Sequence, residues 1–213
     1  MTRILFIRHG ESEANEQGLF AGHLNVYLTD RGREQARLTA EFVAQNYSVD
    51  KVYASDLHRA FDTGKAVADR LGLPITACPS LREIHAGEWD GVRFDDLADL
   101  YPADFHVWYT DRPNARCTGG ESVAEAADRI CATLTEIARE NDGKTVVVAS
   151  HATPISSFLA LIHPKGLSSM PEIGWVPNAS VTELTYENGK FAPVRIGMAD
   201  HLADLKTELP ANI

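Results

Sequence analysis

The stretch Ile4-Leu5-Phe6-Ile7-Arg8-His9-Gly10-Glu11-Ser12 predicts a buried strand that runs directly into a polar loop. In open α/β sheets, ligands bind beyond the carboxyl ends of the strands, so Arg8 and His9 are expected at a binding rim. The Arg8 guanidinium suits phosphate oxygens, and a neutral His9 imidazole can act as a nucleophile. Gly10 lets a ligand approach the backbone. Taken alone, the pair could equally be a solvated strand end.

Segments of strand and helix character alternate along the rest of the chain. Strands are expected at residues 3–8, 51–54, 75–78, 145–149, 181–186 and 191–196, the last two as a hairpin. Helices are expected at residues 30–46, 56–72 and 121–141, with Ser55 or Asp56 capping the second, and two short helices at 94–109 separated at Pro102. Residues 12–29 are expected to be a loop, and the last dozen residues a short helix or tail.

This alternation predicts an α/β fold. We expect a three-layer sandwich, with a mostly parallel central sheet, helices on both faces and a small helical lid. The whole chain, residues 1–213, is expected to be one domain, and residues 86–120 to be the lid that selects the substrate.

The bulk composition limits the function classes. The 213 residues are 44% hydrophobic, enough for one large core, and the formal charge is −10. That charge disfavours nucleic acid or an anionic membrane as partner. Cys78, Cys117 and Cys131 are odd in number and form no C-x-x-C pair, so we expect reduced thiols. With no leader-like or membrane-spanning run, we expect a cytoplasmic protein, and a homodimer paired through an edge strand remains possible.

Three expected strands end in polar side chains. The first ends at Arg8-His9, the second leads to Ser55 and Arg59, and the strand at 145–149 leads to His151. Because parallel strands place their carboxyl ends at one edge, these residues are expected to converge. Arg59 in a first helical turn opposes the helix dipole, a conflict that a bound phosphate would remove. Each residue alone could still be an ordinary surface or strand-end group.

At this level of detail the chain resembles the histidine phosphatase superfamily, in its phosphoglycerate-mutase-like branch. The resemblance spans residues 3 to about 186 and rests on five ordered motifs: Arg8-His9-Gly10-Glu11-Ser12 with Asn15, Ser55-Asp56-Leu57 with Arg59, Leu81-Arg82-Glu83 leading to Gly87-Glu88-Trp89, Gly120-Glu121-Ser122, and Val148-Ala149-Ser150-His151.

The resemblance implies a role for each matching residue. His9 would be the phosphorylated nucleophile, and Glu83 the proton donor to the leaving oxygen. Arg8, Arg59 and His151 would bind the transferring phosphoryl group. Ser12, Asn15 and Ala152 would line the phosphate pocket, with alanine at 152 where the family often has glycine.

The chemistry of phosphoryl transfer fits these roles, because it depends mostly on positioning and on stabilising negative charge. We expect His9 to be neutral, His151 to be protonated beside a phosphate dianion, and the pKa of Glu83 to be raised. No carboxylate cluster is apparent, so we predict no metal and no cofactor.

The segment around Glu83 favours a phosphatase over a cofactor-dependent phosphoglycerate mutase, since it is similar to broad-specificity and cobalamin-pathway phosphatases. The expected substrate is a small phosphorylated metabolite. Its contact wall is expected to include aromatic residues and, if the substrate is acidic, lid arginines: Trp89, Phe105, Trp108, Tyr109, Arg93, Arg112 and Arg116. His85 could bond the leaving group or merely perturb Glu83.

Two other classes remain as alternatives. A serine hydrolase would use Ser12 as nucleophile with His151 as base, which requires a helix directly after Ser12. A non-catalytic phosphate-binding or scaffold protein would not need the complete set of catalytic residues. That set is present, as Glu83, His9, Arg59 and His151.

Overall fold

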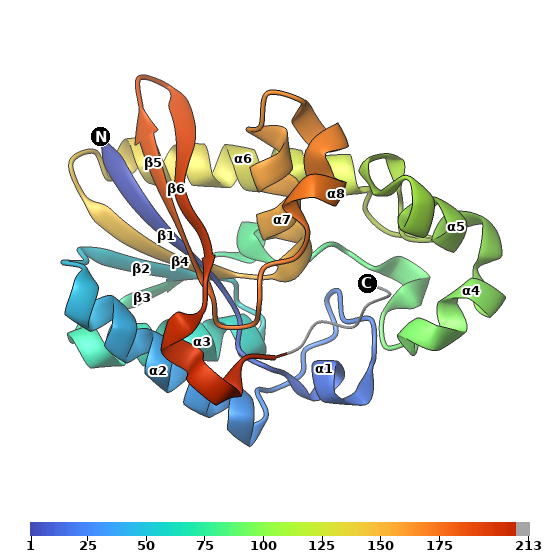
Figure 1. The fold of residues 1–213 in the computed structure, drawn as a ribbon, viewed down its shortest axis with the longest axis horizontal. Coiled ribbons are helices and arrows are strands. Elements are labelled where there is room, and N and C mark those ends of the chain that lie inside the picture. The colour runs from blue at the N-terminus through green and yellow to red at the C-terminus, as the bar shows by residue number, and fades with distance from the viewer. Residues whose placement is uncertain (208–213) are drawn as a thin grey trace.

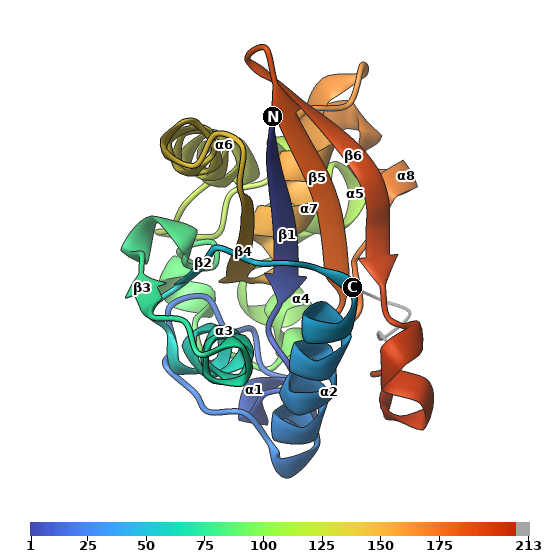
Figure 2. The same cartoon turned by 90° about the vertical axis from the view of Figure 1, so that its left-hand side faces the viewer.

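The computed structural model describes residues 1–207, and six strands form its central sheet in the order β3-β2-β4-β1-β5-β6 (Figures 1 and 2). β1, β2, β3 and β4 run parallel, whereas β5 and β6 form an antiparallel hairpin at one edge. The predicted mostly parallel α/β sheet is therefore confirmed. The strands are β1 (Thr2–Arg8), β2 (Lys51–Ala54), β3 (Ile75–Ala77), β4 (Thr145–Ser150), β5 (Val181–Glu187) and β6 (Lys190–Met198).

Helices cover both faces of this sheet (Figure 2). Leu5, Ile7 and Val147 pack with residues of α2 and α3, whereas Ile4, Phe6 and Val148 pack with residues of α6 and α7. This alternation explains why β1 and β4 read as continuous apolar runs, because both faces of each strand are buried. The helices are α1 (Glu13–Gln17), α2 (Asp30–Asn46), α3 (His58–Leu71), α4 (Leu97–Leu100), α5 (Pro102–Thr110), α6 (Val123–Glu140), α7 (Ala152–Leu161) and α8 (Met170–Ile173).

The segment predicted to be a lid, residues 86–120, carries α4 and α5 and extends away from the sheet (Figure 1). It packs around the buried indole of Trp89 in a hydrophobic cluster of its own, separate from the two clusters that flank the sheet. Phe20 contributes an aromatic ring to this cluster from the loop after α1, 5.5 Å from Trp89 between ring centroids. Two short helices separated at Pro102 are present, as predicted.

The loop expected over residues 12–29 is partly wrong, because α1 begins directly after Ser12. Ser12 caps this helix: its hydroxyl accepts from the Asn15 amide, and the Asn15 side chain accepts from the Ser12 amide. Reciprocal bonds of this kind form a capping box, usually recognised by glutamate or glutamine at the third position. Asparagine at that position concealed the helix in the sequence.

The predicted cap of α3 is also wrong. The N-cap is Leu57, which makes no side-chain capping bond. The Asp56 carboxylate forms a bidentate ion pair with Arg82. The Ser55 hydroxyl lies against His151, the residue after β4. Neither side chain is available to the amides of the first turn.

The carboxyl-terminal segment docks on α2. Residues Asp200–Leu205 form 3₁₀ turns, and the Gln35 amide donates to the Leu205 carbonyl while its oxygen accepts from the Glu11 amide. The expectation of a short helix or tail holds for these turns, and residues 208–213 lie outside the described part.

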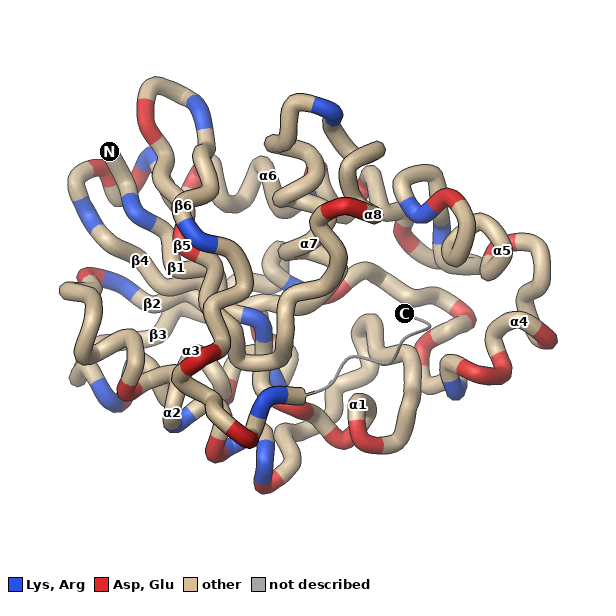
Figure 3. Tube along the Cα trace, viewed as in Figure 1, with Lys and Arg blue, Asp and Glu red and all other residues tan. Residues whose placement is uncertain are grey.

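Acidic and basic residues are interspersed around the periphery in the view of Figure 3. None of the helices between residues 1 and 207 combines the length and apolar character needed to cross a bilayer.

Candidate active site

The ends of three parallel strands bring the candidate side chains together. Arg8 pairs in register with Ser150, so that His9 and His151 follow at neighbouring strand ends. Their imidazole rings lie 5.2 Å apart between centroids, at an interplanar angle of 59°. The convergence expected from the parallel order is therefore present.

A cavity that opens to solvent lies at this edge of the sheet. Eight of the residues proposed from the sequence line it, Trp108 of the expected contact wall among them, together with further apolar residues. The lining residues are Arg8, His9, Ser12, Asn15, Leu19, Phe20, Ala21, Arg59, Glu83, Phe94, Trp108, Ala152, Thr153 and Trp175.

The backbone holds the His9 ring in one orientation. Nδ1 lies 2.7 Å from the Gly10 carbonyl oxygen, which can only accept, so Nδ1 carries the proton and Nε2 keeps its lone pair. Burial, together with the positive charges of Arg59 and Arg8, holds the pKa of His9 well below its usual range. The imidazole is therefore neutral and nucleophilic at Nε2.

Glycines allow this loop to lie close to α2. A Cβ on Gly10 would come within 2.5 Å of the Gly32 carbonyl oxygen, and a Cβ on Gly32 within 1.9 Å of the Glu11 carbonyl oxygen. No side chain fits in either place. The loop that carries His9 is thereby packed against the first turn of α2.

Two buried arginines supply positive charge beside His9. Arg8 donates to the Val176 carbonyl at 2.7 Å, and Arg59 donates to the carbonyls of Ala21, Gly22 and Leu24. Burial lowers the pKa of each guanidinium to about 10, so both remain cationic at neutral pH. Arg59 thus also fixes the loop that forms one side of the cavity.

The Glu83 carboxyl group reaches the cavity from the segment after β3. One oxygen accepts from the Ile84 amide at 2.8 Å, and the other from the Thr153 amide, in the first turn of α7, at 3.3 Å. Burial raises the pKa of Glu83, against the lowering effect of these amides and of Arg59. The group is thus shifted toward its protonated form, as predicted.

The His151 imidazole is fully buried at the neighbouring strand end. Its Nε2 lies 2.9 Å from the Ser55 hydroxyl oxygen, and Nδ1 has no partner among the described residues. Burial lowers the pKa of His151 well below its usual range, and Arg59 and His9 lower it further. Both imidazoles are therefore neutral, because a dry site beside cations disfavours a further positive charge.

Ser12 lines the cavity, but its hydroxyl is used in capping. It donates to Asn15 Oδ1 at 3.0 Å, and that oxygen also accepts from the Asn178 side chain. The helix that a serine nucleophile would need is present, because α1 begins at Glu13 where a loop was expected. The histidine that would activate it does not contact Ser12, since His151 Nε2 lies against the Ser55 hydroxyl.

The residues that line the cavity do not include His151, which is fully buried behind it. They also do not include His85 or the predicted substrate contacts Arg93, Arg112 and Arg116. Arg116 binds the Glu125 carboxylate and the Gly120 carbonyl. Arg112 lies over two indole rings, and of the neighbours Arg93 and Phe94 only Phe94 lines the cavity. The exposed His85 ring packs against His23 at 4.9 Å and lines a separate surface hollow.

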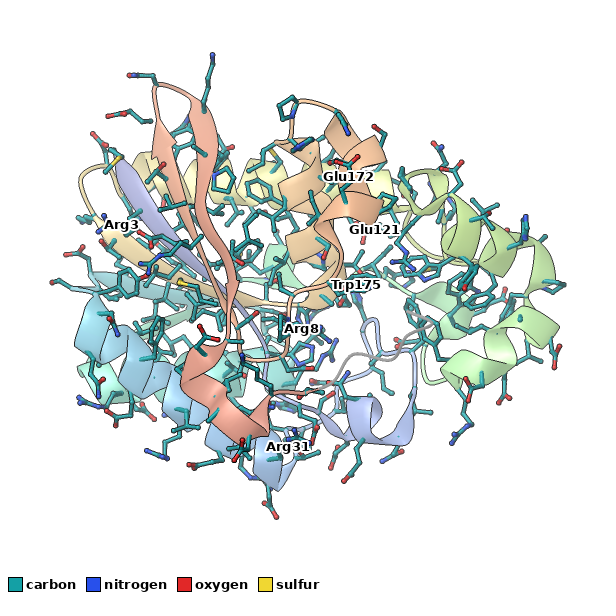
Figure 4. The ribbon with its side chains drawn as sticks, viewed as in Figure 1. Arg3, Arg8, Arg31, Glu121, Glu172 and Trp175 are labelled. Atoms are coloured by element: carbon teal, nitrogen blue, oxygen red, sulfur yellow. The ribbon has the colours of Figure 1, made fainter. Side chains whose placement is uncertain are left out.

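Sequence reasoning missed several wall residues: Leu19, Phe20, Ala21, Phe94, Thr153 and Trp175. Of the four aromatic residues expected in the wall, only Trp108 lines the cavity, since Trp89 and Phe105 pack inside the aromatic cluster and Tyr109 is exposed. Figure 4 labels Arg8 at the strand end and Trp175 in the segment after α8. That segment enters β5, whose amino end meets the carboxyl end of β1 because the two strands are antiparallel. The direction of β5 was the signal that could have found Trp175.

Comparisons with known proteins agree on one family. The sequence model of the histidine phosphatase superfamily (branch 1) matches residues 4–198. Phosphoserine phosphatase 1 of Hydrogenobacter thermophilus is 29% identical over 208 residues, which are 98% of each chain. Glucosyl-3-phosphoglycerate phosphatase of Mycolicibacterium vanbaalenii is 31% identical, over 91% of each chain.

A solved structure shows the same fold. The phosphoserine phosphatase of Entamoeba histolytica, in complex with 3-phosphoglyceric acid, superposes with a TM-score of 0.84. The two sequences are 25% identical, and the match covers 95% of this chain and 100% of the other.

Proposed function

Because this chain belongs to branch 1 of the histidine phosphatase superfamily, we propose that it hydrolyses small phosphomonoesters through a phosphohistidine at His9. Phosphatase activity on small phosphorylated metabolites is what its named relatives have in common. The observation that carries the proposal is the neutral His9 ring, with Nε2 free, beside Arg8 and Arg59.

In the first step, Nε2 of His9 attacks phosphorus and the bond from phosphorus to the ester oxygen breaks. Glu83 gives its proton to that oxygen, so the alcohol leaves neutral. Arg8, Arg59 and His151 stabilise the charge on the equatorial oxygens. The imidazole of His151 gains a proton-accepting partner when a phosphate dianion is bound, which favours its charged form.

In the second step, the Glu83 carboxylate takes a proton from water as the water oxygen attacks phosphorus. The phosphorus–nitrogen bond breaks, and orthophosphate leaves. Return of the phosphoryl group to a reoriented product would give mutase activity instead. Hydrolysis is favoured because the arginines expected to hold an acidic product, Arg112 and Arg116, do not line the cavity.

Replacement of the nucleophile tests the mechanism. His9→Ala is expected to abolish turnover and the phosphoenzyme, which should be labile in acid and stable in alkali. Ser12→Ala, which removes a helix cap, should cost about 1 kcal/mol of stability and keep the activity. His106→Ala, on the exposed face of α5, is the control for loss of a histidine. Turnover that persists in His9→Ala would contradict the mechanism.

We further propose that the enzyme acts without metal and in the cytoplasm. Among residues 1–207 there is no group of three or more His, Cys, Asp or Glu side chains placed to hold a metal ion. Cys78, Cys117 and Cys131 are unpaired, which suits a reducing compartment. The homodimer remains a prediction. Its pairing surface would be β6, the edge strand of the sheet within residues 1–207, where Val194 and Ile196 are exposed. Sedimentation would measure the oligomeric state.

A further inference from the structure

The cavity has two chemically different halves. The phosphate half is formed by charged and polar residues at the strand ends, while the outer wall is apolar and comes from three other segments. Leu19 and Phe20 come from the loop after α1, Phe94 and Trp108 from the 86–120 segment, and Trp175 from the segment before β5.

Charged groups are confined to the phosphate half. The lining residues include two arginines, Arg8 and Arg59, and one carboxyl group, Glu83. A carboxylate or ammonium group on the departing alcohol would therefore be desolvated against the outer wall without an oppositely charged lining partner, which is costly. The wall favours an uncharged leaving group.

The two indole rings of the wall contact a guanidinium group that does not line the cavity. The Arg112 guanidinium lies 4.9 Å from the centroid of Trp175 and 5.3 Å from that of Trp108, and its Nε donates to the Trp108 carbonyl. Arg8 fixes the next residue along, because it donates to the Val176 carbonyl. These contacts position the indole rings without a ligand, and a preformed wall lowers the entropy lost on binding.

We propose that this wall binds flat, uncharged, apolar leaving groups, so that the preferred substrates are phosphomonoesters of aromatic or similarly hydrophobic alcohols. The proposal rests on the phosphatase function above and narrows its substrate class. It separates this chain from the substrate named for its phosphoserine phosphatase relatives, because phosphoserine carries both a carboxylate and an ammonium group.

The test compares benzyl phosphate with O-phosphoserine, which are both esters of primary alcohols and so differ little in leaving-group chemistry. We expect kcat/KM to be at least about tenfold higher for benzyl phosphate, because burial of one aromatic ring in the transition state stabilises it by enough free energy for that factor. In Trp175→Ala the ratio of the two kcat/KM values should fall about tenfold, and Trp175→Phe should restore most of it. Tyr109→Ala, an exposed aromatic residue on α5, is the matched control and should leave the ratio unchanged.

The outcomes separate this inference from the function on which it rests. A ratio near one or below in the wild type, or one that Trp175→Ala does not change, would overturn the inference while phosphatase activity stands. No phosphate release from either ester, or from p-nitrophenyl phosphate, would refute the function itself. Inhibition by orthophosphate, measured on each variant, reports whether the phosphate half is intact. If Trp175→Ala has lost this inhibition because it is misfolded, the ratio of the two kcat/KM values in Trp175→Phe decides between the outcomes.

Discussion

The hydroxyl oxygen of Ser55 lies 2.9 Å from Nε2 of His151, and both side chains are fully buried. Ser55 follows β2 and His151 follows β4, so the contact joins two neighbouring strand ends. The same hydroxyl oxygen accepts from the Leu57 amide, which fixes its position. Ser55 is therefore a positioning residue, which sets the plane of the His151 ring beside His9.

Ser55→Ala is expected to lower kcat about fivefold, because the His151 ring loses its hydrogen bond to the Ser55 hydroxyl, worth about 1 kcal/mol. The affinity for vanadate should fall with kcat, since both depend on the oriented ring. Ser157→Ala on α7 removes another fully buried serine hydroxyl and should leave both unchanged. Equal effects of the two substitutions would show that Ser55 acts only on stability.

The pH dependence should report Glu83. Its pKa is raised by burial, and the donor role needs the proton, so kcat/KM should fall as pH rises through that raised pKa. Glu83→Gln should remove this alkaline limb and lower kcat for benzyl phosphate about 100-fold. The loss should be smaller for p-nitrophenyl phosphate, whose leaving group needs no proton. Glu88→Gln, exposed in the same segment, is the control, and an alkaline limb that survives in Glu83→Gln would assign it to another group.

Gly32→Ala should destabilise the protein by about 3 kcal/mol and lower its melting temperature by about 8 °C. The new Cβ would meet the Glu11 carbonyl oxygen at 1.9 Å, and backbone atoms cannot rotate aside. Gly64→Ala in α3 is the matched control, since the atoms nearest its Cβ belong to side chains, the first being Ala54 Cβ at 3.0 Å. Thermal unfolding of both variants measures the difference, and similar melting temperatures would contradict the predicted packing of α2 on the loop.

Chelation is expected to leave turnover unchanged, because guanidinium and imidazole groups supply the positive charge at the phosphate half. Steady-state rates before and after dialysis against EDTA measure this. Loss of activity that Mg²⁺ or Zn²⁺ restores would show that the enzyme needs a metal ion.

Much of the fold was predictable because it depends on patterns local in sequence. The apolar runs of β1 and β4 indicate strands that are buried on both faces. Thr29 is the N-cap of α2, a residue type that favours the start of a helix. The parallel order then placed His9, Arg59 and His151 at one edge. The start of α1 was missed because Asn15 completes its capping box in place of a carboxylate or glutamine.

The outer wall was not predictable in the same way. Whether Arg112 faces a ligand or stacks on indole rings depends on packing between segments more than 60 residues apart, such as α5 and the segment with Trp175. Likewise, Arg116 looks free in the sequence, but α6 places Glu125 beside it. Side-chain direction in irregular segments is set by tertiary contacts, which carry no local periodicity.

The aromatic cluster around Trp89 is separate from the two clusters on the sheet, and this separation has an evolutionary consequence. Residues of the outer wall can change while the strand ends keep their spacing, because the fully buried residues of the two regions belong to different clusters. A few substitutions near Trp108 can thereby change which esters the protein prefers, while the catalytic residues stay the same.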